Sequence, residues 1–167
     1  MSTPIDRNVN WLFTTRMSAY TSKGKALIAP ADFKGIKIRG INSLNDAGLT
    51  ALGAAPSAMS GSKVYQALST GVIDAGLTDI SATVSRKYYE VQDHVTASPL
   101  FSVFFHGYVN PTWYDGLSDM QKTVLDNAGK KAAQWALDAT EASAKDAPQK
   151  LREKGVKVHM HTAAENA

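Results

Sequence analysis

Short apolar strands alternating with capped, glycine-terminated helical segments are the feature that most constrains this chain. Residues 36–39 read Ile-Lys-Ile-Arg, an alternation with the period of a half-buried strand. Two segments, 43–53 and 62–71, carry a Ser or Asn at the start, apolar residues at helical spacing and a glycine at the end. A short apolar strand at 72–77 follows. This alternation predicts an α/β fold whose mixed, largely parallel sheet is flanked by helices.

The remaining segments extend the same pattern. The expected strands cover 11–17, 96–109 as one strand or a pair, and 156–160. The expected helices cover 80–91 and a long segment that opens at Ser118, with Gln121 three residues later, and runs to about residue 144. Turns are expected at 20–25, at 29–35 and at Pro148, with a last helix closed by Gly155.

We find no internal repeat and no linker between independent domains. The expected organisation is a flexible N-terminus over 1–10, a single α/β lobe over 11–162 and a tail over 163–167. With 167 residues, 44% hydrophobic and 20% charged, the chain is long and apolar enough to fold around a core. This composition excludes a disordered or fibrous protein.

Composition also removes several function classes. The chain has no cysteine, which excludes a disulfide scaffold and thiol chemistry. Its net charge of +3 comes from short basic pairs rather than a basic stripe, so no nucleic-acid partner is predicted. No stretch of the sequence is long and apolar enough for a membrane span. The first residues lack the pattern of a secretory signal, so the protein is either cytoplasmic or has lost its start.

Catalytic and metal-binding patterns are not found. His159 and His161 lie two apart on an expected strand, but no third ligand suits them, and solvated histidines on an edge strand are the preferred interpretation. His106 follows an aromatic run and is expected to be buried and hydrogen bonded. Nucleophile elbows and phosphate-binding glycine loops are missing. We therefore predict no catalytic residue, no metal, no cofactor and no enzyme activity.

Arg39 is the best candidate for a binding residue. It ends an expected strand of an open α/β sheet, where such folds form their ligand crevice, and its guanidinium suits a carboxylate. A surface arginine in the loop after the strand is the alternative. Thr78 and Asp79 follow the strand at 72–77 and reach the same rim, where either could instead cap the helix expected from Ile80.

The order of these motifs resembles a known family. Residues 30–39, PADFKGIKIR, are similar to the P-x-D-L-K-G-L-K-I-R segment of DctP-type solute-binding proteins of TRAP transporters. The segments LGAAP at 52–56 and KVYQALSTGVID at 63–74 resemble the family's L-G-A-x-P and E-V-Y-x-A-L-Q-T-G-V-V-D. RKYYEVQ at 86–92 and LREKGVKV at 151–158 continue the resemblance, which covers roughly residues 11–160.

The resemblance implies a lobe of the type II periplasmic-binding fold and a non-enzymatic protein of the periplasm. In that family the Arg of the K-I-R strand binds the carboxylate of an organic acid, which implies this role for Arg39. Thr78 stands where the family has an Asn near the ligand, and Arg16 corresponds to an upstream Arg that helps to hold it. Phe101 and Ser102 fall where the family lines its pocket on the next strand.

The resemblance also implies partners. A DctP-type protein delivers a small organic acid to the membrane subunits of its TRAP transporter. Family members have two lobes, whereas this chain resembles the second lobe with crossing elements. Apolar surface that the other lobe does not cover would favour association with another copy of the chain. The alternative function is therefore a structural or self-associating α/β domain that has lost ligand binding.

Overall fold

The computed structural model of the chain describes residues 8–15 and 17–165, which form two compact units. We call residues 17–103 and 142–165 the sheet unit, and residues 8–15 and 104–141 the ribbon unit. The helix α5 (Asp119–Glu153) contributes residues to both. Among the described residues, no helix combines the length and apolar character that a membrane span requires.

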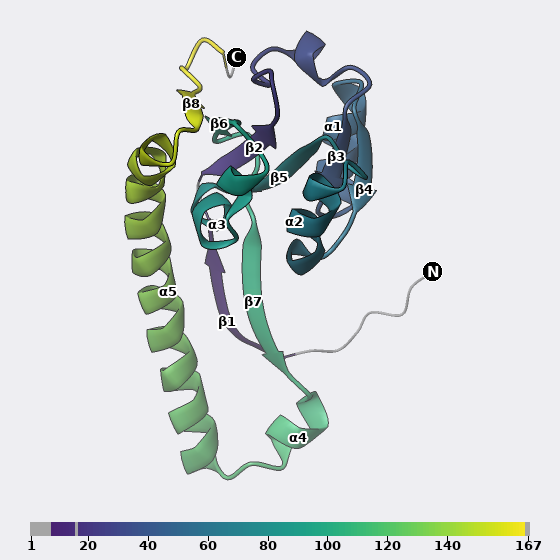
Figure 1. The fold of residues 1–167 in the computed structure, drawn as a ribbon. Helices are drawn as coiled ribbons and strands as arrows, with labels where there is room; N and C mark the ends of the chain where they lie inside the picture. The colour runs from purple at the N-terminus through teal and green to yellow at the C-terminus, as the bar shows by residue number, and fades with distance from the viewer. Residues whose placement is uncertain (1–7, 16, 166–167) are drawn as a thin grey trace. The chain divides into compact units, whose positions relative to one another are not determined.

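The sheet unit is built on a six-stranded mixed sheet with the order β4-β3-β5-β2-β6-β8 (Figure 1). Its strands are β2 (Ser18–Ser22), β3 (Lys37–Gly40), β4 (Ala55–Ala58), β5 (Ala75–Asp79), β6 (His94–Ser98) and β8 (Lys157–Met160). The pairs β3/β4, β3/β5 and β6/β8 are parallel, whereas β2 runs antiparallel to β5 and β6. The predicted fold class, with a mixed and largely parallel sheet, is confirmed.

Helices cover both faces of this sheet. They are η1 (Pro30–Phe33), α1 (Ser43–Ala51), α2 (Gly61–Ser69), α3 (Ile80–Ser85), η2 (Tyr88–Glu90) and the end of α5. The sequence predicts α1 well: the Asn42 side chain caps it by accepting a hydrogen bond from the Asn45 N–H at 3.0 Å. The single turn η1 and a helix at 61–69 are confirmed as well.

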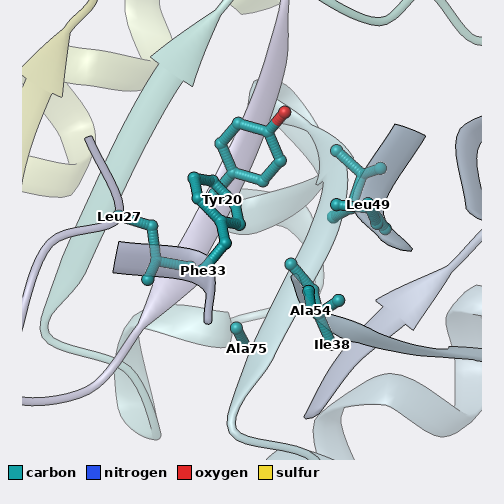
Figure 2. Close-up of a cluster of buried hydrophobic side chains, with 8 residues drawn as sticks. Tyr20, Leu27, Phe33, Ile38, Leu49, Ala54 and Ala75 are labelled. Carbon is teal, nitrogen blue, oxygen red and sulfur yellow. The ribbon is translucent and has the colours of Figure 1, made fainter. Parts of the chain in front are cut away.

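One face of the sheet carries the aromatic core of the sheet unit, and we call it the Tyr20 face. Tyr20 lies edge-on against Phe33 with 4.8 Å between ring centroids, and Figure 2 shows both rings among the neighbouring aliphatic side chains. The buried members of this cluster are Tyr20, Leu27, Phe33, Ile38, Leu49, Ala54, Ala75 and Leu77. The burial of Ile38 here determines where its neighbour points, because successive side chains of a strand face opposite sides.

The opposite side is the Arg39 face. A Cβ atom at Gly76 would lie 3.6 Å from Val64 of α2, which places that helix on this face. Ile80 at the start of α3 packs in a second cluster with Ala19, and Leu151 of α5 belongs to the same cluster. The Arg39 face is therefore covered by α2, α3 and the end of α5.

The ribbon unit consists of two antiparallel strands and helical segments. β1 (Asn8–Thr14) pairs with β7 (Phe104–Val109), and the chain continues into α4 (Pro111–Asp115) and the first part of α5. Phe13 stacks on Phe105 across the ribbon with 5.1 Å between the ring centroids. The capping box predicted from Ser118 and Gln121 is confirmed, since the Ser118 N–H donates to Gln121 Oε1 at 2.9 Å.

Three local predictions were wrong, and one strand was missed. The expected turn at 20–25 begins in the central strand β2, and the strand β4 was not expected. The helix expected at 80–91 breaks after Ser85, because Lys87 takes a left-handed conformation with φ of 56°. Residues 99–103 separate β6 from β7, so of the two arrangements expected for 96–109 the structure has the pair of strands.

Pro148 does not end a helix, which is the third correction. α5 continues through it to Glu153. A proline inside a helix loses a hydrogen bond and crowds the preceding turn at a cost of about 3 kcal/mol. Here Ala147 and Leu151, on either side of Pro148, are almost completely buried against the sheet. Their packing offsets the cost and keeps the helix continuous.

Candidate functional site

Arg39 is placed by strand alternation on an interior strand. β3 has β4 on one side and β5 on the other, and Arg39 lies opposite Ser57 and Gly76 in the parallel register. Because Ile38 turns into the Tyr20 cluster, the Arg39 side chain points to the other face. Its exposed fraction is only 9%, so this is not an arginine extended into bulk solvent.

Two main-chain carbonyls hold the Arg39 guanidinium. Nε donates to the Met59 carbonyl at 3.2 Å and Nη1 donates to the Leu77 carbonyl at 2.8 Å. These bonds fix the plane of the guanidinium between the ends of two neighbouring segments. A guanidinium carries five N–H donors, so the Nη2 amino group remains for another acceptor.

The charge of Arg39 has no acidic partner within the described part of the chain. No carboxylate there lies within ion-pair distance of its guanidinium. Burial lowers the pKa of Arg39, Tyr88 opposes this shift, and the neighbouring cation Arg86 lowers it further. An arginine stays protonated under such shifts. A buried cation without a counter-charge is costly, and an incoming anion would relieve that cost.

Thr78 lies on the same face, one strand away from Arg39. It occupies β5 two residues beyond Gly76, the register partner of Arg39, and its exposed fraction is 4%. The sheet therefore brings Arg39 and Thr78 to one side, as neighbouring strands of parallel direction allow.

Asp79 acts as the cap of α3. Its Oδ1 accepts from the Ser81 N–H at 2.8 Å and from the Ser81 hydroxyl. The sequence allowed either Thr78 or Asp79 as the cap of this helix, and the structure uses Asp79. Its second oxygen, Oδ2, is buried without a hydrogen-bond partner among the described residues.

Phe101 and Ser102 lie apart from Arg39. The Phe101 ring packs edge-on to Tyr20 at 6.4 Å and lies over Gly48 of α1, so its contacts belong to the Tyr20 face. Its N–H donates to Ser18 Oγ at 3.3 Å. Ser102 is exposed. Arg16, the remaining sequence candidate, lies outside the described residues.

The sequence analysis missed two side chains next to Arg39. Tyr88 is fully buried, and its hydroxyl donates to the Gly61 carbonyl at 3.2 Å. The Arg86 guanidinium lies directly against Gly61, where a Cβ atom would be 1.8 Å from Nη1. The only sign of this contact in the sequence is Gly61, because the start of a helix does not require a glycine.

The histidines form no site in the structure. His106 is exposed on β7 and stacks on Tyr108 at 5.5 Å, so the expectation of a buried histidine was wrong. His159 lies on the edge strand β8, and its Nε2 is 3.0 Å from Glu165 Oε1. Across residues 8–15 and 17–165, no group of three side chains is arranged to hold a metal ion.

The sequence of the chain is similar to that of known solute-binding proteins. The model of the family DctP, described as bacterial extracellular solute-binding protein, family 7, matches residues 9–167. A curated relative, the C4-dicarboxylate-binding periplasmic protein DctP of Rhodobacter capsulatus, is 35% identical over 154 residues. The match covers 87% of this chain and 44% of the relative.

Solved structures agree on the fold. A TRAP periplasmic solute-binding protein from Rhodoferax ferrireducens with bound malonate superposes with a TM-score of 0.89 at 24% identity, covering 95% of this chain and 51% of that one. A marine metagenome TRAP solute-binding protein in complex with pyroglutamate has a TM-score of 0.87 at 25% identity, with coverage of 95% and 52%. The chain thus spans about half the length of the relatives it matches.

Proposed function

The chain belongs to family 7 of the bacterial extracellular solute-binding proteins, the DctP family, and from this membership we propose that it binds the carboxylate of a small organic acid through Arg39. Proteins of this family bind solutes and are not enzymes. The observation that carries the proposal is Arg39, a residue only 9% exposed, whose guanidinium is held in plane by two carbonyls and has no acidic partner among the described residues.

The physical chemistry of Arg39 supports a carboxylate as its ligand. A planar guanidinium pairs with a carboxylate through two parallel hydrogen bonds, which select both charge and geometry. The carbonyls of Met59 and Leu77 hold the guanidinium before any ligand arrives, so little side-chain entropy is lost on binding. Relatives with bound malonate and pyroglutamate show that the fold accommodates such acids.

Thr78 is proposed as a second contact, with Arg16 as a further one by its place in the family pattern. Thr78 is buried on the Arg39 face and can give or accept one hydrogen bond. A hydroxyl in place of the family's amide changes which group of the ligand is recognised. We therefore expect the acid to differ from those of relatives with Asn at this position.

We further propose that the protein works in the periplasm and hands its ligand to TRAP membrane subunits. The curated relative from Rhodobacter capsulatus is a periplasmic protein, which supports this location. Ligand uptake by vesicles that contain the membrane subunits should depend on added protein. Uptake that proceeds equally without the protein would contradict the proposed delivery.

Ligand-dependent thermal unfolding tests the binding proposal. The purified chain is heated with a panel of aliphatic, aromatic, keto and sugar acids, and an acid at about a hundred times its Kd should stabilise by about 2.7 kcal/mol. Arg39→Lys keeps the charge but loses the planar fork, so the shift should shrink. Arg39→Gln should abolish it.

Calorimetric titration of the folded variants separates lost binding from lost stability. Both Arg39 variants are titrated well below their own unfolding temperatures, because truncation leaves the Leu77 carbonyl unpaired. Lys37→Gln, on the same strand and exposed, is the matched control and should bind like the wild type. Equal affinity in wild type and Arg39→Gln would refute the role of Arg39.

Self-association is the second candidate function, because apolar side chains of the ribbon unit are exposed. An apolar groove on α4 and α5 is lined by Trp113, Leu117, Met120, Gln121, Val124, Leu125 and Ala128. Met120 and Val124 are 75% and 64% exposed. Exposed apolar surface of this kind marks an interaction site, and we propose a second copy of the chain as its occupant.

Light scattering after size exclusion tests this candidate. Val124→Glu places a charge in the groove and should shift the protein from dimer to monomer. Thr123→Glu adds the same charge at an exposed neighbour that does not line the groove, and should leave the mass unchanged. A wild-type protein that is monomeric at high concentration would exclude self-association.

A further inference from the structure

The guanidinium of Arg39 is held by two carbonyls that lie in different kinds of structure. The Leu77 carbonyl, at 2.8 Å, belongs to the buried interior strand β5. The Met59 carbonyl, at 3.2 Å, lies outside any strand or helix, between β4 and α2. The direction of the guanidinium therefore depends on what keeps residues 59–61, the segment that leads into α2, in place.

The start of α2 is not fixed by its own capping residue. Within the described chain, the Ser60 side chain accepts no hydrogen bond from the first turn, and its hydroxyl lies 3.1 Å from that of Ser62 instead. The strand β4, which precedes this segment, is the outermost strand of the sheet, and its residues are mostly exposed. Residues 59–61 therefore depend on an anchor from another part of the fold.

Tyr88 supplies that anchor. Its hydroxyl donates to the Gly61 carbonyl at 3.2 Å. Its ring is fully buried in a cluster with apolar side chains of α2, and Met59 packs against the same cluster. Burial lowers the pKa of Arg39 and Tyr88 opposes this shift, so the two side chains lie close together. Tyr88 thus holds both ends of the segment whose first carbonyl receives the Arg39 Nε–H.

We propose that Tyr88 is a positioning residue of the Arg39 site, which sets the plane of the guanidinium for a carboxylate through residues 59–61. This inference rests on the proposed function of Arg39, and adds a residue that acts through Met59 rather than on the acid itself. Two parallel hydrogen bonds to a carboxylate require one orientation of the guanidinium, and a guanidinium held by Leu77 alone could turn about that single bond. The Tyr88 hydroxyl therefore contributes to affinity by restricting Arg39 before the acid arrives.

Tyr88→Phe removes this hydrogen bond and leaves the core filled. Phenylalanine keeps the ring in its cluster, and the Gly61 carbonyl keeps a partner, because a carbonyl in the first turn of an α-helix accepts from the amide four residues later. The variant should therefore fold. Tyr65→Phe is the matched control, since the Tyr65 hydroxyl also joins α2 to η2, through an exposed hydrogen bond to Glu90 Oε2 at 2.8 Å.

Calorimetric titration measures the contribution of Tyr88 to affinity. The probes are malonate, benzoate, pyruvate and glucuronate, one acid from each class of the panel described above. An acid that the wild type binds should bind about threefold to tenfold more weakly to Tyr88→Phe, as expected for the loss of one hydrogen bond that orients the binding group. Tyr65→Phe should bind it within about twofold of the wild type.

The Arg39 Nε–H reports its own positioning without any ligand. In isotope-labelled protein its magnetic resonance signal is the arginine signal that Arg39→Lys lacks, and its exchange with water is slow while the Met59 carbonyl accepts the hydrogen bond. Tyr88→Phe should speed this exchange by about threefold or more, and Tyr65→Phe should leave it unchanged. A merely structural role of Tyr88 would lower the unfolding temperature and leave both exchange and affinity as in the wild type.

Affinity and exchange must change together in Tyr88→Phe. A change in only one of them, or in neither, would overturn the proposal. A loss of affinity in Tyr65→Phe as large as that in Tyr88→Phe would overturn it as well, because any link between α2 and η2 would then serve. If the wild type binds none of the acids, the proposed function fails, whereas the exchange rates still show whether Tyr88 holds Arg39.

Discussion

The sheet unit and the ribbon unit differ in where their apolar side chains lie. Every buried apolar side chain that the structure describes belongs to the sheet unit, in three clusters around the six-stranded sheet. The ribbon unit instead exposes large apolar residues, among them Phe104 at 65% and Trp135 at 73%. The sheet unit thus has its own core, whereas the ribbon unit presents its apolar residues to the outside.

This difference gives the two units different roles, because the sheet unit stabilises the fold and the ribbon unit offers surface for association. A two-stranded ribbon is at best marginally stable by itself, and the contacts of Phe13 with Trp11 and Phe105 are ring stacks rather than a buried core. The free energy of unfolding must therefore come mainly from the sheet unit, which also carries Arg39. The ribbon unit offers surface for a partner, such as the second copy proposed above.

The largest expected effect compares two positions on one helix. Leu151 of α5 is fully buried in the sheet unit, whereas Met120 of the same helix is 75% exposed in the ribbon unit. Leu151→Ala should lower the free energy of unfolding by about 2–5 kcal/mol, since it leaves a cavity in a packed cluster. Met120→Ala should change it by less than about 0.5 kcal/mol.

Urea unfolding followed by circular dichroism measures both variants. They are compared at a protein concentration at which wild type and variants have the same mass by light scattering, because association would add stability. Similar losses at the two positions would show that the ribbon unit has a core of its own. The contrast between the units would then be wrong.

Sequence patterns predicted the elements whose signals are local. Asn42 caps α1, Ser118 and Gln121 form the box before α5, and the alternation at 36–39 identified the strand that carries Arg39. β2 was missed because Ser18-Ala19-Tyr20-Thr21-Ser22 looks polar, although all five residues are buried between β5 and β6. A central strand of small and polar residues has no hydrophobic period for a sequence analysis to detect.

The candidate site was only partly predictable for a similar reason. Arg39 is placed by the period of its own strand, but its neighbours come from distant segments. The Arg86 guanidinium lies against Gly61, which has no side chain, and no period of the sequence places these two residues together. Phe101 lies on the Tyr20 face, because the loop after β6 folds over Gly48 of α1.

A smaller effect is expected from backbone conformation. Gly155, which ends α5 in the sheet unit, has a φ of +83°, whereas Gly116 of the ribbon unit has a φ of −72°. A Cβ atom at Gly155 would meet nothing within 4 Å, so only backbone strain opposes alanine there. Gly155→Ala should cost about 1–2 kcal/mol in unfolding free energy.

Gly116→Ala is the matched control in the other unit. Its φ suits any residue, and its nearest neighbours would lie at ordinary contact distances of 3.5 and 3.6 Å from the new Cβ atom. Alanine there should be neutral or slightly stabilising, because it restricts the unfolded chain. A loss at Gly116 as large as that at Gly155 would show that the ribbon unit is more tightly packed than its exposure indicates.

The smallest expected effect concerns acid stability of the sheet unit. The pKa of Asp32 is lowered by its hydrogen bond with Lys25 and by the Ala29 and Ile28 N–H groups that it accepts from at the start of η1. A carboxyl group with a lowered pKa in the folded state stabilises the fold above its unfolded pKa of about 3.9, and this contribution is lost as the pH falls toward the folded pKa. Asp32→Asn should therefore flatten the decrease in unfolding free energy below about pH 5, by less than about 1 kcal/mol for a pair of this exposure.

Asp115→Asn, at an exposed position of the ribbon unit, should follow the wild-type profile in urea titrations from about pH 6 down to about pH 3. An unchanged slope for Asp32→Asn would mean that the start of η1 contributes nothing to the stability on which the Arg39 site depends.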